Sequence, residues 1–168
     1  RRGQARAHGV DGHMAGAKFA PRGELRRAGL GRAFAKLDPA FDIDGVDAAH
    51  KLALLTSLAF GCEVGFDDVH VEGIRAISPL DIRFAEELGY RIKLLGLASR
   101  TGKGIEQRVH PCMVPADASI AHVSGSFNAV VVNGDFIDTI VLEGQGSGAG
   151  PTASAVVADL LDIARNSK

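Results

Sequence analysis

The sequence predicts an α+β fold in which helices cover one face of a mixed or antiparallel sheet. Two turn sequences, Thr101-Gly102-Lys103-Gly104 and Asn133-Gly134-Asp135, indicate two β-hairpins and so predict the sheet. Stretches before and after the hairpins carry apolar residues at helical spacing and predict the covering helices. Hairpins combined with helices in this order are typical of layered α+β folds. The 168 residues are enough for one domain with a sizeable hydrophobic core, or for two small domains with little core each.

The composition excludes several classes of protein. Hydrophobic residues make up 46% and charged residues 23% of the chain, which is ordinary for a soluble globular protein and excludes a disordered or fibrous one. No apolar run approaches the ~20 residues of a membrane helix, and no secretion signal is recognisable. Cys62 and Cys112 are too few for a disulfide framework and lack metal-site spacing. We therefore expect a cytoplasmic protein with two packed thiols and no bound metal.

The first segment differs in charge from the rest. Residues 1–37 hold nine Lys and Arg against two acidic residues, residues 38–168 hold ten against eighteen, and the net charge is -1. A basic segment can bind nucleic acid, but this one lacks interleaved aromatic residues and any recognisable nucleic-acid module. A poorly folded tail is the favoured interpretation. Only residues 23–36 suggest a weak helix there, interrupted by two glycines.

The first clear helix follows Gly45 and runs to about residue 60. Its apolar residues recur at helical spacing, and they are Val46, Ala49, Leu52, Ala53, Leu55, Ala59 and Phe60. Asp44 is placed to cap its start, and Gly61 stands where a helix would stop. Residues 67–74 then alternate like a short strand or a tight connection.

A second helix is predicted from the cap Ser78 to about Leu88, with Pro79 in its first turn and Gly89 at its end. Two hairpins follow, separated by a short helical turn, and the chain finishes with a Gly-rich loop and a helix. The predicted ranges are 91–100 and 105–114 for the first hairpin, 117–122 for the turn, 128–134 and 135–144 for the second hairpin, and 151–164 for the last helix.

The stretch 38–51 carries the most informative polar residues. Asp47 and Lys51 are four residues apart, so on a helix they share a face near its N-terminus, and Asp42 and Asp44 come just before it. An ammonium held beside carboxylates is kept charged and in place, which suits a proton donor to a carbonyl oxygen. The same spacing is also typical of an exposed structural pair worth about 0.3–0.5 kcal/mol. Spacing alone leaves both interpretations open.

This stretch resembles the homoserine dehydrogenase signature, D-P-x-x-D-[aliphatic]-x-G-x-D-x-x-x-K. Every fixed position is filled, by Asp38, Pro39, Asp42, Ile43, Gly45, Asp47 and Lys51. Residues 70–98, 110–135 and 143–165 are similar to later stretches of the same family. The resemblance covers about residues 38–165 and implies the fold of the family's catalytic region.

The resemblance also implies a reaction, the NAD(P)H-dependent interconversion of aspartate semialdehyde and homoserine, on the route to threonine, methionine and isoleucine. Lys51 matches the lysine that exchanges a proton with the substrate oxygen, and Asp47 matches the acid that binds substrate and orients that lysine. Asp42 matches an acid that holds the amino end of homoserine. Gly148, in one loop with Gly146, matches a glycine that lies against the cofactor, NADP or NAD.

Two departures from the family are visible, and one Gly-rich loop needs separate comment. Lys36 stands where the family has a substrate-binding Glu, and a lysine repels the ammonium that the Glu would bind. No Gly-x-Gly-x-x-Gly follows an N-terminal strand, as the family's nucleotide-binding domain would require. Gly144-x-Gly146-x-x-Ala149 lies between a strand and a helix, but no second strand or ribose-binding acid follows before Lys168, so a complete dinucleotide fold is not expected.

The chain is therefore expected to have three parts. Residues 1–37 form an atypical basic segment, disordered or out of frame, residues 38–142 the catalytic and dimerisation domain, and residues 143–168 a loop and helix that pack on the missing nucleotide-binding domain. One hypothesis is a truncated homoserine dehydrogenase that is inactive on its own, joined to out-of-frame or foreign sequence. The alternative is a non-enzymatic, dimerising remnant or partner subunit. The resemblance implies a homodimer through the sheet, with neither a membrane nor a nucleic acid as partner.

Overall fold

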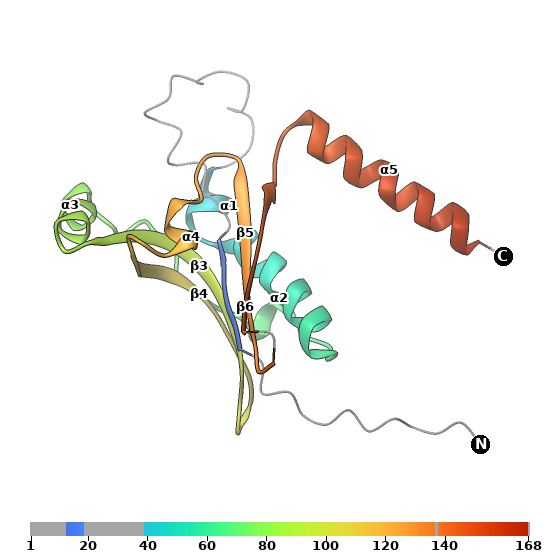
Figure 1. Ribbon diagram of the computed structural model, residues 1–168, viewed down its shortest axis with the longest axis horizontal. Helices are drawn as coiled ribbons and strands as arrows, with labels where there is room; N and C mark the ends of the chain where they lie inside the picture. Colours follow the sequence, from blue (N-terminus) through green and yellow to red (C-terminus); the bar gives the residue numbers. More distant parts are fainter. Residues whose placement is uncertain (1–12, 19–38, 137, 168) are drawn as a thin grey trace.

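A computed structural model describes residues 13–18, 39–136 and 138–167 and shows helices packed on a six-stranded sheet (Figure 1). The strand order is β2-β4-β3-β1-β5-β6. The short β2–β4 pair is parallel and the other neighbours are antiparallel, so the sheet is mixed and the predicted α+β fold is confirmed. The elements are β1 (His13–Lys18), α1 (Pro39–Ile43), α2 (Val46–Phe60), η2 (Phe66–Asp68), β2 (His70–Val71), α3 (Pro79–Glu87), β3 (Tyr90–Thr101), β4 (Gly104–Pro115), α4 (Ser119–His122), β5 (Phe127–Gly134), β6 (Asp138–Gln145) and α5 (Ala149–Asn166).

The two predicted hairpins are present and continuous. Strands β3 and β4 pair from Tyr90 opposite Pro115 to the turn after Thr101. Strands β5 and β6 pair from Phe127 opposite Gln145 to the turn after Gly134. Turn residues and alternating apolar residues are local signals, so both hairpins could be predicted from short stretches of sequence.

Strand β1 lies in the middle of the sheet and pairs with both β3 and β5. The sequence predicts no strand here, because the apolar residues of segment 1–30 follow neither a helical nor a strand period for long. The pairing uses backbone N–H and C=O groups, which almost every residue offers, and its register shifts between Met14 and Ala17. The expected helix over residues 23–36 lies outside the described residues.

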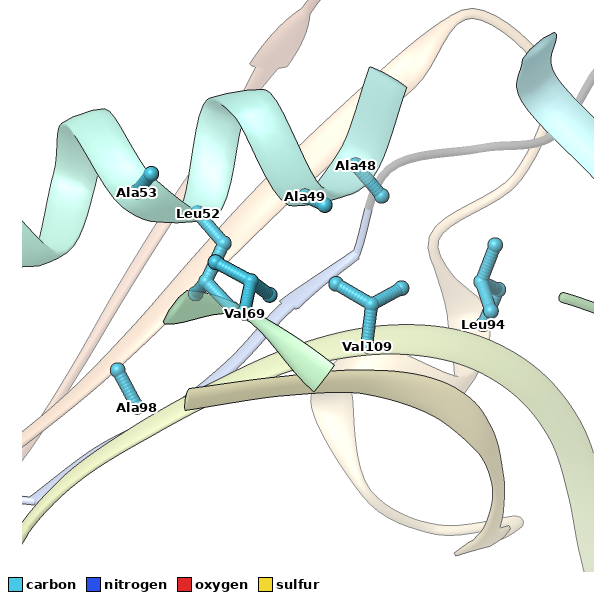
Figure 2. Close-up of a cluster of buried hydrophobic side chains, with 8 residues drawn as sticks. All are labelled: Ala48, Ala49, Leu52, Ala53, Val69, Leu94, Ala98 and Val109. Atoms are coloured by element: carbon cyan, nitrogen blue, oxygen red, sulfur yellow. The ribbon is translucent and has the colours of Figure 1, made fainter. Parts of the chain in front are cut away.

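The main core lies between α2 and one face of the sheet (Figure 2). Small residues on the helix bring its backbone close to the strands, and Leu52 is fully buried. On β3, Leu94 and Ala98 point into this core, whereas Leu95 points to the opposite face, as the two-residue period of a strand requires. The cluster consists of Ala48, Ala49, Leu52, Ala53, Val69, Leu94, Ala98 and Val109.

The opposite face of the sheet carries a smaller cluster under the four-residue helix α4. Leu95 and Val114 from the sheet pack there against Ile120 and Ala121. Strand β6, at the edge of the sheet, is exposed along its whole length, and its exposed large side chains are Ile140, Val141 and Leu142. The second face therefore has far less helical cover than the first.

Helix α2 ends as predicted but begins differently. Gly61 closes it with φ 63°, a left-handed conformation that glycine adopts without strain. At the start, Gly45 has φ 80° and no side chain caps the helix, so the predicted capping role of Asp44 is wrong. The Asp44 carboxylate bonds instead to Arg75, a partner from a distant stretch that local sequence does not reveal.

Helix α3 begins with the predicted cap. The Ser78 hydroxyl accepts a hydrogen bond from the Asp81 backbone N–H at 3.2 Å, and the Asp81 carboxylate accepts from both the N–H and the hydroxyl of Ser78 at 2.7 Å. These bonds from Ser78 hold the pKa of the Asp81 carboxyl below its usual value. Because the pKa is lower in the folded chain, this stabilisation is fully present above the ordinary Asp pKa and is lost as the pH falls from there through the lowered pKa of the folded chain.

Replacing Ser78 by alanine is therefore expected to lower the free energy of unfolding by about 1 kcal/mol near neutral pH. Urea unfolding followed by circular dichroism measures this loss. Repeating the titration at low pH should shrink the difference between the variant and the unmodified chain, because the Asp81 carboxyl is then protonated in both. If the difference in the free energy of unfolding stayed constant down to low pH, the hydrogen bonds from Ser78 to the charged Asp81 carboxylate would not contribute to stability.

Helix α5 stands apart from the sheet at the end of the chain (Figure 1). It starts two residues before the predicted Pro151 and has no buried residue. Its expected apolar side is open to solvent, with Val156, Leu160 and Ile163 exposed by 54%, 60% and 63%. No helix in the described part of the chain is long and apolar enough to span a membrane.

Candidate functional site

Asp47 and Lys51 form the ion pair that their spacing predicts. The Lys51 Nζ donates a hydrogen bond to Asp47 Oδ2 at 2.7 Å within the first turns of α2. The neighbouring Ala48 and Leu52 are buried against the sheet, so the helix presents the pair on its outer side. The side chain of Lys51 is 41% exposed and that of Asp47 is 34% exposed. A small molecule can therefore reach the ammonium while the carboxylate fixes its direction.

Asp42 lies in the short helix α1, and Asp44 lies in the tight connection from α1 to α2. The Asp44 N–H donates to Ala40 O at 2.8 Å, and the Gly45 N–H donates to Asp42 O at 3.3 Å. The connection thus places Asp42 at the end of one helix, just ahead of the helix that carries Asp47. Asp42 and Asp44 thus precede α2 in the chain, and Asp47 lies in its first turn, where the helix dipole favours negative charge.

Arg75 is a charged neighbour of this connection that the sequence analysis misses. Its Nη2 donates to Asp44 Oδ2 at 2.9 Å, and its Nε donates to the other carboxylate oxygen. These hydrogen bonds hold the pKa of the Asp44 carboxyl below its usual value. The two residues are 31 positions apart, so no motif spacing links them.

The backbone around Gly73 packs directly on the same connection. The Ile74 N–H donates to Ile43 O at 2.9 Å, and a Cβ at position 73 would lie 2.5 Å from that same oxygen. On the other side, the Glu72 N–H donates to Val109 O at 2.7 Å and ties the segment to the sheet. An isolated glycine in a strand-like stretch is a signal of close backbone approach that could have marked this contact.

His50 is exposed on α2. Its ring stacks on Phe66 with centroids 4.1 Å apart and lies near Phe41 with centroids 6.2 Å apart. The three rings come from α2, η2 and α1. The stack gives His50 a packing role beside the acidic residues.

The Gly-rich loop links the end of β6 to α5. Asn128 packs against it so closely that a Cβ on Gly146 would lie 1.8 Å from the Asn128 Nδ2. The Gly146 N–H also donates to Ser126 O at 2.8 Å. Gly148 has φ 120°, a conformation that side chains other than glycine rarely adopt. The loop therefore needs glycine at position 146 to admit Asn128 and at position 148 for its backbone conformation.

The remaining expected site residues have simple placements. Lys36 lies outside the described residues. Cys62 and Cys112 are free and half-buried, which is less buried than expected for packed thiols. Burial raises the pKa of the Cys112 thiol, and the nearby positive charge of Arg108 partly offsets this rise. Among residues 13–18, 39–136 and 138–167, no cluster of three His, Cys, Asp or Glu could hold a metal ion.

Comparison with known proteins gives consistent matches. A family model for homoserine dehydrogenase matches residues 26–161. Homoserine dehydrogenase from Pseudomonas aeruginosa is 52% identical over 132 residues, and that from Neisseria gonorrhoeae is 53% identical over 132 residues. Each match covers 79% of this chain and 30% of the relative, so the chain spans about 30% of the length of these curated relatives. The family match starts upstream of the boundary at residue 38 that the charge break suggests.

Solved structures agree with the fold. The crystal structure of a homoserine dehydrogenase from Thiobacillus denitrificans superimposes with a TM-score of 0.80 at 42% identity, over 93% of this chain and 39% of that one. A hyperthermophilic archaeal homoserine dehydrogenase in complex with NADPH is 22% identical, with a TM-score of 0.65 over 90% of this chain and 46% of that one, and shares the fold.

Proposed function

This chain belongs to the homoserine dehydrogenase family, and we propose that it supplies the substrate-binding and proton-transfer side of the interconversion of aspartate semialdehyde and homoserine. The observation that carries the proposal is the Lys51 ammonium, held 2.7 Å from Asp47 inside the family motif and open to solvent. In the reducing direction, Lys51 donates a proton to the carbonyl oxygen. In the oxidising direction, Lys51 acts as the neutral amine, accepts the proton of the homoserine hydroxyl and becomes the ammonium.

The carboxylates have separate roles in this proposal. Asp47 accepts the hydrogen bond that directs the ammonium, and a preorganised charge of this kind costs no rearrangement during the reaction. Asp42 and Asp47 bind the amino end of homoserine through charge-assisted hydrogen bonds. Lys36 stands at the position of the family's substrate-binding Glu, and its positive charge would repel the ammonium of the substrate. In this chain, Asp42 and Asp47 would therefore bind that ammonium without help from position 36.

Gly146 and Gly148 would hold the nicotinamide cofactor, NADP or NAD. The support is the loop backbone at Gly148, which has φ 120° and where a Cβ would lie 3.6 Å from Pro151, whereas at Gly146 the Asn128 side chain fills the space of a Cβ. When bound, the nicotinamide supplies the hydride. Gly148 would contribute by leaving room for a flat ring to approach the backbone, and Gly146 by letting Asn128 pack against the loop.

We assign the catalytic and dimerisation roles to residues 38–142. Residues 143–168 then pack on the nucleotide-binding part of a complete homoserine dehydrogenase, which would cover the exposed apolar side of α5. On this basis, the 168-residue chain alone is expected to show no turnover. Oxidation of NADPH with aspartate semialdehyde should therefore not exceed that of a Lys51→Ala control, and clear excess activity would contradict the assignment of an inactive fragment.

Homoserine binding tests the proposed site without turnover. Asp47→Asn is expected to weaken the binding of L-homoserine by about tenfold or more, because a hydrogen bond to a charged group is lost. Titration followed by two-dimensional NMR measures the affinity. Asp159→Asn, which neutralises an exposed carboxylate on α5, is the matched control and should keep the affinity within about twofold of the unmodified chain. Equal affinity of the two variants, or no saturable binding by the unmodified chain, would contradict the proposal.

The exposed strand β6 favours a second candidate, a non-enzymatic module that forms homodimers through its sheet. Its exposed edge offers unpaired backbone groups beside Ile140, Val141 and Leu142. Light scattering combined with NADPH titration separates the candidates. A dimer that binds neither NADPH nor homoserine supports the module, and saturable binding of either one supports the dehydrogenase site.

A further inference from the structure

We propose that Arg75 is a positioning residue, which fixes the turn between α1 and α2 and thereby sets Asp42 relative to Asp47 and Lys51. The role of these three residues toward substrate rests on the proposed function. The positioning itself rests on contacts of the turn with residues 72–75 and can be tested separately. Nothing in the spacing of the sequence motif assigns Arg75 to the site.

Contacts hold the turn from two directions. The Arg75 guanidinium bonds both oxygens of Asp44, and the Ile74 N–H donates to Ile43 O at 2.9 Å. Gly73 brings its backbone within reach of the Asp44 Cα, which would lie 2.6 Å from a Cβ at position 73. The Glu72 N–H anchors this segment to Val109 on the sheet. Through residues 72–75, the turn between α1 and α2 is therefore attached to the sheet as well as to its own two helices.

The Arg75 pair is suited to orientation rather than to overall stability. The side chains of Arg75 and Asp44 are 61% and 40% exposed, and exposed ion pairs contribute little to the free energy of folding. Two parallel bonds from one planar guanidinium nevertheless define a direction, which a single contact does not. Asp44 is two residues after Asp42 and three before Asp47, so rotation of this turn moves both carboxylates.

Direct binding of the substrate carboxylate by Arg75 is the alternative. The geometry disfavours it, because the Nε and Nη2 edge of the guanidinium is already bonded to Asp44. If Arg75 bound the substrate directly, neutralising Asp44 would release it and strengthen binding. If Arg75 acts through Asp44, neutralising either partner should have the same effect.

A double-mutant cycle with Arg75→Ala, Asp44→Asn and the double variant tests the proposal in the full 168-residue chain. The first readout is amide hydrogen exchange at Asp44 and Gly45, which should be faster by about tenfold in each single variant, since the turn opens locally. The second readout is the affinity for L-homoserine, which should fall by about tenfold in each single variant. The double variant should be no worse than either single one, because both remove the same interaction.

Two further variants sharpen the test. Arg75→Lys keeps the charge but not the two-pronged geometry, so it should behave like Arg75→Ala. Arg83→Ala removes an exposed arginine from α3 and should leave both readouts unchanged. The thermal midpoint should be the same for all of these variants, which separates positioning from a purely structural role.

The outcomes decide between the proposals. Unchanged amide exchange in Arg75→Ala overturns the positioning role, whatever the homoserine affinity does. Tighter homoserine binding by Asp44→Asn, or additive losses in the double variant, overturns it in favour of direct contact. Absence of homoserine binding by the unmodified chain overturns the proposed function, and the exchange readout still decides whether Arg75 fixes the turn.

Discussion

Replacing Gly73 by alanine is expected to lower the free energy of unfolding by about 3 kcal/mol. The added Cβ would lie 2.5 Å from Ile43 O and 2.6 Å from the Asp44 Cα. Both are backbone atoms, so no side-chain rotation relieves the overlap, and the segment has to move away from the turn. Urea unfolding followed by far-ultraviolet circular dichroism measures the loss.

Gly102→Ala provides the matched control for this prediction. It introduces the same methyl group where no atom lies within 4 Å. Its effect on the free energy of unfolding should stay within about 0.5 kcal/mol. If the two alanine variants were equally stable, the close contact of residue 73 with the α1–α2 turn would be refuted.

Replacing Leu52 by alanine is expected to cost about 2–5 kcal/mol, because it leaves a cavity in the main core. Leu52 is 0% exposed and packs between α2 and the sheet beside Val69 and Val109. The midpoint of chemical unfolding reports the loss. The small neighbours on α2 cannot fill the space, since they are alanines already in contact with the strands.

Leu58→Ala on the same helix separates burial from helix propensity. Leu58 is 82% exposed, so its truncation changes the intrinsic preference for helix as in Leu52→Ala but removes almost no packing. We expect a change within about 0.5 kcal/mol. Similar losses from both variants would mean that α2 does not dock on the sheet through the Leu52 face.

The elements that could be predicted are those with local signals. The cap at Ser78, the stop at Gly61 and the turn at Gly134 each fix one end of an element within a few residues. The spacing of Asp47 and Lys51 likewise predicts their contact, because residues four apart on a helix share a face. In all of these, the interacting groups are neighbours in the chain.

The parts that escaped prediction depend on distant partners. Asp44 is a good capping residue by type, but a guanidinium 31 positions away binds its carboxylate instead. The close approach of Gly73 to Ile43 involves backbone atoms from two separate stretches. Neither contact leaves a pattern in any short window of sequence, so only the fold reveals them.

The central place of β1 has a consequence for assembly of the chain. The two hairpins can form early, because each joins neighbouring stretches, and hairpin closure takes about 1–10 μs. They do not touch each other directly in the strand order, and His13–Lys18 bridges them. Because that bridge pairs with strands far away in sequence, we expect its insertion to be slower than the formation of either hairpin. If a protease removed β1, the strands β3 and β5 would lose the neighbour with which both of them pair.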